Sequence, residues 1–194
     1  MKIYGKMLVF ITMLGLFTSG VLLVVNALTL DRIAENEAAA LYSTILDGND
    51  IDYTIGTITE TFEEEIEVHE FEGLTYYIHM DSGRVSFEFE GGGVWGPIIG
   101  VLTLEDDFET IKAISILQQE ETPGLGGVVA EEEYLETFVG KKMTPEIVIS
   151  KEADTSLDNE VDSITGATRT SEAFQAILNE AYGEYQDALD DYQE

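Results

Sequence analysis

The segment from Met7 to Leu30 constrains this chain most, because its 24 consecutive residues include no ionisable side chain. As a helix rising ~1.5 Å per residue it would be ~36 Å long, which is enough to cross a hydrocarbon core of ~30 Å. A cleaved signal peptide is the alternative, but the apolar core of such peptides is only roughly 7–15 residues long. The sequence therefore predicts a cytoplasmic tip and a retained transmembrane helix within residues 1–30.

The distribution of charge predicts the orientation of this helix. Lys2 and Lys6 precede the apolar segment, whereas Arg32 is almost alone among acidic residues after it. Because cytoplasmic flanks carry the excess of Lys and Arg, we expect a single-pass protein of the cell (inner) membrane, with a cytoplasmic N-terminus and an extracytoplasmic main domain. The part after Leu30 holds all 39 acidic and seven of the nine basic residues, a net charge of −32.

This charge and the composition exclude several classes of function. A surface that binds nucleic acid needs clustered Lys and Arg to neutralise phosphates, so no nucleic-acid partner is predicted. The chain has no cysteine, which excludes disulfides, thiolate metal sites and iron–sulfur clusters. The acidic turns starting at Asp47 and Asp158 lack the spacing of a calcium loop, and His69 and His79 have no second ligand at metal spacing. No metal site is therefore predicted.

The remainder of the chain has the pattern of a mixed domain. Residues 31–47 are rich in Ala, Glu and Leu and predict a helical stalk that stops at the turn Asp47–Asp50. A domain over 48–194 then contains predicted strands at 62–71, 74–80, 85–90, 98–104, 110–117 and 146–150, and predicted helices at 131–139 and 171–192. Hairpins followed by helices, without regular alternation, indicate an α+β fold with an antiparallel sheet and flanking helices.

Three polar or glycine-dense segments are the candidates for a binding site. Two are loops, Gly91–Pro97 and Glu120–Gly127, and the third, Asp162–Thr168, leads into the last helix with hydroxyl groups beside the free N–H groups of its first turn. Such a helix start favours a phosphate. The simpler interpretation is that Thr168 or Thr170 only caps the helix, as Ser and Thr often do.

The sequence D-S-I-T-G-A-T at Asp162–Thr168 resembles the flavinylation signature of the FMN-binding domain family. The loops G-G-G-V-W-G-P-I at Gly91–Ile98 and E-T-P-G-L-G-G at Glu121–Gly127, in this order upstream of it, are similar to the G subunit of Rnf complexes and the C subunit of sodium-pumping NADH:quinone oxidoreductases. The resemblance covers the anchor and roughly residues 91–180. The chain departs from the pattern at Thr165, where Ser is commoner, and at Val94, where a larger apolar side chain is expected.

The resemblance implies a covalent FMN cofactor. In this family the last threonine of the signature, here Thr168, forms a phosphoester with FMN. The preceding residues of the signature would be recognised by a Mg-dependent flavin transferase that uses FAD as donor; they are Asp162, Thr165, Gly166 and Ala167. The small Gly and Ala side chains would leave the threonine hydroxyl unobstructed.

The resemblance also implies a pocket for the isoalloxazine ring. Trp95 and Leu125 would line the ring, and Glu121 and Thr122 would supply polar contacts. For Trp95 and Leu125 the alternative is simple packing in the core.

The function implied is electron relay within a membrane complex that moves Na⁺ or H⁺, with other membrane subunits as partners. Between the two related types, the short chain favours the Rnf ferredoxin:NAD type, whereas the Trp95 loop and the residues Gln119–Thr122 resemble the NADH:quinone type more closely. We expect the Rnf type, with the NADH:quinone type a close second. Two alternatives remain: a free-standing membrane-anchored FMN carrier for another reductase, and a non-redox anchored module whose acidic face binds a cationic partner. In the second, Thr168 would be unmodified.

Overall fold

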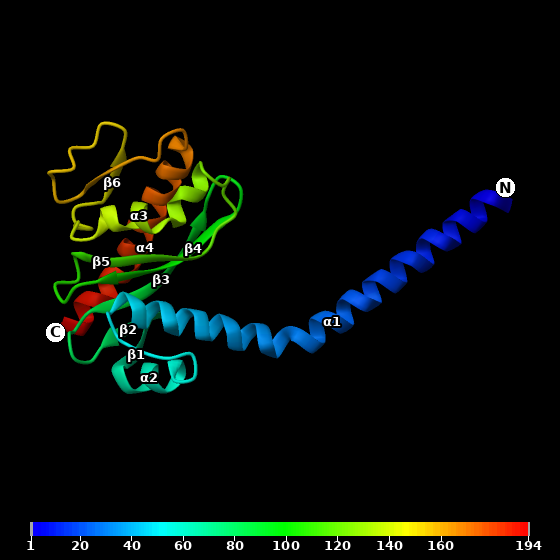
Figure 1. Ribbon diagram of the computed structural model, residues 1–194, viewed down its shortest axis with the longest axis horizontal. Coiled ribbons are helices and arrows are strands. Elements are labelled where there is room, and N and C mark those ends of the chain that lie inside the picture. Colours follow the sequence, from blue (N-terminus) through cyan, green and yellow to red (C-terminus); the bar gives the residue numbers. More distant parts are fainter. Residues whose placement is uncertain (1, 194) are drawn as a thin grey trace. The chain divides into compact units, whose positions relative to one another are not determined.

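A computed structural model describes residues 2–193 of the chain, which divides into two compact units, Met1–Ala39 and Ala40–Glu194 (Figure 1). One helix, α1 (Lys2–Gly48), begins in the first unit and ends in the second. It ends within the turn at Asp47–Asp50 that was predicted to stop it. From Ile3 onward α1 is long and apolar enough to span a membrane, with a mean hydropathy of 2.5 in its most apolar window and none of that window buried.

The second unit is built on a five-stranded sheet in which every neighbouring pair is antiparallel. The strands lie side by side in chain order and are β1 (Ile66–Phe71), β2 (Leu74–His79), β3 (Val85–Gly92), β4 (Pro97–Leu104) and β5 (Ile111–Gln118). Short hairpin turns make this order possible; the first contains Gly73 at φ +93°, a conformation that glycine adopts without strain. The predicted antiparallel sheet and α+β class are confirmed.

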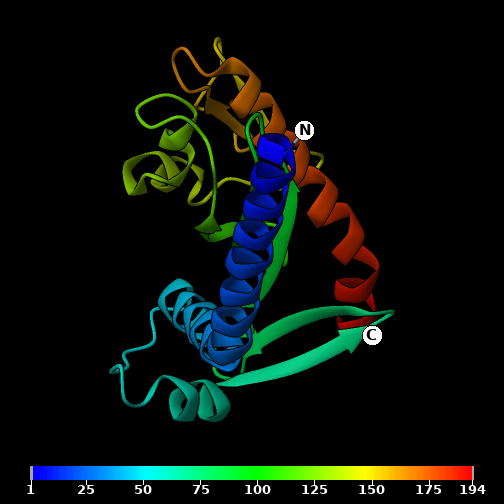
Figure 2. The same ribbon diagram turned by 90° about the vertical axis from the view of Figure 1, so that its right-hand side faces the viewer.

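Helices cover both faces of the sheet. The long helix α4 (Thr168–Gln193) packs on one face, where Phe87 and Phe89 of β3 contact its buried side chains, including Phe174 (Figures 1 and 2). The other face receives the last residues of α1, of which Ile45 and Leu46 are fully buried. Figure 2 shows the C-terminal end of α4 beside the β1–β2 hairpin. The sheet is therefore packed between two clusters of apolar side chains. The first glycine loop connects β3 to β4 at one end of the sheet.

The predicted strand at 62–71 is wrong in its first part. Helix α2 (Ile58–Glu65) occupies that part, and the strand begins only at Ile66. Phe62 is the one buried residue of α2, and its ring stacks on Tyr42 with the centroids 4.0 Å apart. A helix buries this single aromatic ring while its glutamates stay in water, whereas an alternating strand would turn every second residue toward the sheet.

The C-terminal half contains several short elements, and the first and last of them were not predicted from the sequence. They are η1 (Gly126–Ala130), α3 (Glu132–Leu135), η2 (Glu136–Phe138), β6 (Val148–Ser150) and β7 (Glu160–Asp162). The predicted helix at 131–139 corresponds to α3 and η2, and the predicted strand at 146–150 to β6. Strand β7 was expected to be an acidic loop, but it pairs with β6 in parallel. Three residues are too few to show an alternating pattern in sequence.

The last helix begins earlier than predicted, at Thr168 instead of Ser171. The Ser171 hydroxyl accepts the N–H of Ile164 at 3.0 Å and donates to the carbonyl of Ala167 at 3.2 Å. These two bonds close the turn Ile164–Ala167 onto the helix. Thr168 is therefore the first residue of α4.

Candidate functional site

The three segments singled out in the sequence meet around one cavity of about 290 Å³. It lies between the β3–β4 loop, the loop before η1 and the start of α4. Its lining residues are Val94, Trp95, Glu121, Thr122, Leu125, Gly126, Gly166, Ala167, Thr168, Arg169 and Thr170. Its volume is at the lower end of the ~300–1,000 Å³ typical of small-molecule pockets, so it would enclose part of a large ligand.

The carboxylate of Glu121 joins these three segments. One oxygen, Oε1, accepts the backbone N–H groups of Val94 at 2.6 Å and Trp95 at 3.0 Å. The other, Oε2, accepts the hydroxyl of Thr170 at 2.8 Å. Only 5% of Glu121 is exposed. Both oxygens are therefore occupied by donors of the protein itself.

Glycines allow the segments to approach this closely. A Cβ on Gly93 would lie 2.6 Å from Glu121 Oε1, and one on Gly126 would lie 2.6 Å from the Thr170 hydroxyl oxygen. Gly166 has φ +83°, and a Cβ there would meet the Leu125 side chain at 3.3 Å. A side chain at Gly93 or Gly126 would displace the Glu121 carboxylate or the Thr170 hydroxyl, and one at Gly166 would be strained by the positive φ.

Two large apolar side chains that line the cavity are exposed to solvent. Trp95 is 70% exposed and Leu125 is 45% exposed. The alternative that they pack in the core is therefore wrong. Burying such exposed apolar side chains under an apolar ligand is favourable, and a flat aromatic ring can stack on the face of an indole.

The start of α4 offers hydrogen-bond donors to the same cavity. The first helical bond runs from the N–H of Ser171 to the carbonyl of Ala167 at 3.0 Å, so the amides of residues 168–170 have no acceptor within the helix. Within the described residues, the half-buried Thr168 hydroxyl has no hydrogen bond, and that of Thr170 goes to Glu121. Among the described residues, neither threonine hydroxyl accepts a backbone N–H of the first turn, so the interpretation that Thr168 or Thr170 only caps the helix is wrong.

Positive charge is scarce in the domain and one cation lines this cavity. Among its six basic side chains, Arg84, Lys112 and Lys142 have ion pairs and Lys141 donates to two backbone carbonyls. Over residues 2–193 the structure records no hydrogen bond or ion pair for the side chain of Arg169, which is exposed beside Thr168. A guanidinium free of carboxylate partners is suited to bind a phosphate.

Two residues of the predicted signature do not face this cavity. Asp162 and Thr165 line a neighbouring cavity of about 440 Å³, with Lys151, Ser163 and Gly166. Both are exposed, so they are accessible to another protein. Burial raises the pKa of the nearby Tyr134 hydroxyl, and the charge of Asp162 adds to the rise. Tyr134 therefore stays protonated beside this turn.

The structure thus brings together seven of the nine predicted site residues: Trp95, Glu121, Thr122, Leu125, Gly166, Ala167 and Thr168. The sequence analysis did not place Arg169 and Thr170 in the binding site, although they directly follow the signature. The signal for both was available, since residues in the first turn of a helix share its N-terminal end.

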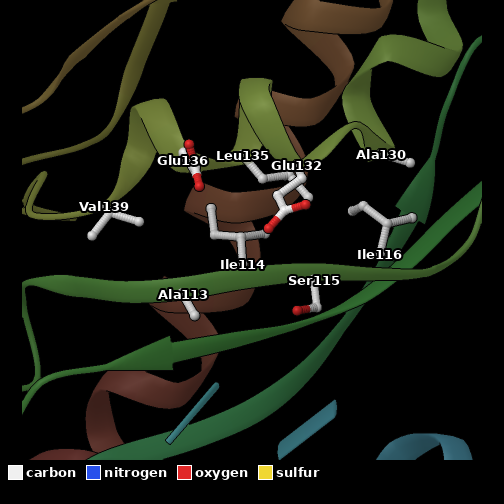
Figure 3. Close-up of a pocket in the computed structure, with 9 residues that line it drawn as sticks. All are labelled: Ala113, Ile114, Ser115, Ile116, Ala130, Glu132, Leu135, Glu136 and Val139. Atoms are coloured by element: carbon white, nitrogen blue, oxygen red, sulfur yellow. The ribbon is translucent and has the colours of Figure 1, made fainter. Parts of the chain in front are cut away.

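A second hollow of about 390 Å³ lies elsewhere, between β5 and the α3–η2 segment. Figure 3 shows the side chains of Ile114 and Ile116 pointing from the strand toward the segment that carries Glu132 and Leu135, whereas Ala113 and Ser115 point to the other side of the strand. This groove contains no basic side chain. It therefore offers no counter-charge for a phosphate.

The fold and the site define a class of protein: an α+β domain that follows an apolar helix, with a cavity lined by a threonine at a helix start and by two exposed apolar side chains. Residues 93–183 match the model of the FMN-binding domain family, which confirms the resemblance predicted from the motifs.

Similar proteins include the C subunit of the Na⁺-translocating NADH-quinone reductase of Neisseria meningitidis serogroup A, which is 31% identical over 107 residues. The aligned segment covers 53% of this chain and 42% of that protein. The protein of the same name from Vibrio alginolyticus is 35% identical over 98 residues, covering 47% of this chain and 38% of that protein. The chain thus matches less than half the length of these relatives. Both are of the quinone-reductase type, so the preference for the Rnf type is not confirmed.

Solved structures share the fold. Shewanella oneidensis NqrC superposes with a TM-score of 0.68 at 18% identity, covering 79% of this chain and 96% of that one. The C subunit of the Na⁺-translocating NADH-quinone reductase of Parabacteroides distasonis gives 0.69 at 22% identity, with 80% and 94% covered. At these identities the likeness establishes the architecture, and the chemistry must be argued from the pocket.

Proposed function

We propose that this protein is an FMN-carrying electron-transfer subunit of a Na⁺-translocating NADH:quinone reductase, with the FMN phosphate esterified to Thr168. One observation carries the proposal: three motifs far apart in sequence converge on a cavity with a free threonine hydroxyl, an unpaired guanidinium and two exposed apolar walls. The relatives of this name favour the NADH:quinone type over the Rnf type.

The residues of the cavity fit FMN by chemistry. The phosphate would be held by the phosphoester at Thr168, the amides of the first turn of α4 and the guanidinium of Arg169. The isoalloxazine would lie against Trp95 and Leu125, which are exposed without it. When bound, FMN supplies one- and two-electron redox chemistry, and the protein sets its position and electrostatic surroundings.

A covalent link also suits the charge of the domain. A phosphate held only by equilibrium binding would have to approach a domain with a net charge near −32. The phosphoester keeps the cofactor in place at any external flavin concentration. A flavin transferase would make this link, and the exposed Asp162 and Thr165 would serve its recognition of the chain.

The test is the intact mass of the full chain, purified in detergent after co-expression with a flavin transferase. We expect the mass of one FMN phosphoester per chain and yellow fluorescence that persists after denaturation. An unmodified mass would refute the covalent site and favour the acidic, non-redox interaction module.

The complex and the orientation need separate measurements. Purification from its native membrane should recover other membrane subunits with the chain; recovery of a flavin-loaded chain alone would favour the free-standing FMN carrier. With Lys2 and Lys6 before the apolar segment, we propose that the domain lies outside the cytoplasm. Protease added to intact cells should then degrade the domain, and protection of the domain would overturn this orientation.

A further inference from the structure

We propose that Glu121 is a positioning residue, whose buried carboxylate holds the glycine loops and the first turn of α4 together as a preformed pocket. The proposal rests on the proposed function for the identity of the ligand. It replaces the role implied by family resemblance, in which Glu121 supplies a polar contact to the flavin.

The hydrogen bonds of Glu121 support an internal role. An ionised carboxylate only accepts hydrogen bonds, and the three donors to the Glu121 carboxylate are two amides of the β3–β4 loop and a hydroxyl of the first turn of α4. Burying a charge is costly unless it is well bonded, and these three bonds offset that cost. The carboxylate therefore lines the cavity while it accepts hydrogen bonds from the surrounding protein.

The glycines on either side support the same role. The space beside Gly93 is taken by Oε1, and the space beside Gly126 is taken by Oε2 and the Thr170 hydroxyl. One carboxylate thus fits between the two glycine loops. Both loops need glycine at these positions because the Glu121 carboxylate occupies the space that a side chain would fill. This reason does not depend on a ligand.

The consequence is a fixed relation between the two ends of the ligand site. Trp95, the exposed wall, donates its amide to Oε1, and Thr170 lies in the same helical turn as Thr168. These bonds join residues that are 26 and 49 positions apart in sequence. Glu121 therefore sets how far the indole lies from the attachment hydroxyl.

The experiment measures amide hydrogen exchange in the flavin-free full chain in detergent, comparing wild type, Glu121→Ala, Glu121→Gln and Glu120→Gln. Glu120 is the matched control, because it is the exposed neighbour and loses the same charge. A hydrogen bond to a charged group is strong enough that its loss should speed exchange at Val94 and Trp95 on the order of tenfold in Glu121→Ala. Glu121→Gln keeps an acceptor and should show a smaller increase, and Glu120→Gln none.

A second measurement separates positioning from direct contact. In flavin-loaded protein, Glu121→Ala should lower the flavin load and shift the absorption maximum, while Glu120→Gln should match wild type. The proposal is overturned if Glu121→Ala and Glu120→Gln exchange alike. It is also overturned if Glu121→Gln alters the flavin spectrum while exchange in the flavin-free chain stays as in wild type, which is the signature of a direct ligand.

Two further arms keep the test decisive. If Glu121→Ala does not fold, Thr170→Val removes the bond to Oε2 alone, and exchange at Val94 and Trp95 must still rise; unchanged exchange overturns the proposal. If no chain ever carries flavin, the proposed function fails, yet the exchange data still decide whether Glu121 holds the loops.

Discussion

Two hollows of the domain, the groove beside β5 and the cavity at Thr168, differ in chemistry more than in volume. The groove between β5 and the α3–η2 segment is larger, at about 390 Å³ against about 290 Å³ for the cavity at Thr168. The groove is lined mainly by apolar side chains, and its polar lining residues are Ser115, Glu132 and Glu136 (Figure 3). The smaller cavity combines hydroxyls, a guanidinium, a buried carboxylate and an exposed indole.

This difference has a physical basis in how the two hollows form. The groove is what remains where two neighbouring segments pack imperfectly, and its chemistry is that of the adjacent core. The cavity needs three distant segments to meet, and each brings a different functional group. Convergent polar groups of this kind fix the orientation of a ligand, whereas apolar area alone does not. The predictions below test this contrast, in order of decreasing effect on the flavin.

The largest effect is expected for Thr168→Ala. Without a hydroxyl there is no atom to form the phosphoester, so covalent flavin should be lost completely, as measured by intact mass and by fluorescence of the denatured chain. Thr168→Ser keeps a hydroxyl at the first position of α4 and should retain part of the load. A full covalent load in Thr168→Ala would place the attachment elsewhere and remove the main distinction between the two hollows.

A several-fold effect is expected for Arg169→Gln. This change removes the unpaired cation of the cavity, and an exposed charge interaction of ~0.5–1 kcal/mol corresponds to flavin attachment slowed about two- to fivefold. The measurement is the rate of flavin incorporation with purified transferase. Lys142→Gln removes the same charge away from the cavity, where Lys142 pairs with Glu109. Equal slowing in both variants would mean that net charge alone matters.

A spectral effect without loss of flavin is expected for Trp95→Ala and Leu125→Ala. Stacking contributes on the order of 0.5–1.5 kcal/mol beyond buried area, so each variant should shift the absorption maximum, midpoint potential and fluorescence yield while Thr168 stays modified. Trp95→Ala should change fluorescence most if the indole quenches the ring. Val139→Ala, an exposed apolar position of the groove, is the control. Spectra unchanged from wild type in both variants would place the ring elsewhere.

No effect on the flavin is expected for Leu135→Ala, which enlarges the groove. Leu135 is partly buried against the core, so the truncation should cost about 1–2 kcal/mol, less than at a fully buried leucine. The melting temperature of the domain should fall by a few degrees, roughly 2–4 °C for each kcal/mol. Flavin content and spectrum should match wild type. A changed spectrum would show that the two hollows are coupled and would weaken the contrast drawn between them.

Much of the fold follows from local sequence patterns. The antiparallel strands were predicted to within a few residues because alternation and glycine turns are short-range signals. The prediction failed at α2, where Phe62 packs against Tyr42 and Tyr77, contacts that only the folded domain supplies. It also failed at β7, which exists because β6 lies beside it.

The sequence alone determined the apolar helix, the α+β class and the identity of the threonine motif, since each is written in contiguous residues. Only the tertiary structure decided that Trp95 and Leu125 are exposed, that the Ser171 hydroxyl joins the turn Ile164–Ala167 to α4, and that Arg169 has no partner within residues 2–193. It also decided that Glu121 is bonded within the protein, through contacts across 26 to 49 residues. Such contacts form only when distant segments pack together in the folded chain, so a local pattern of residue types cannot predict them.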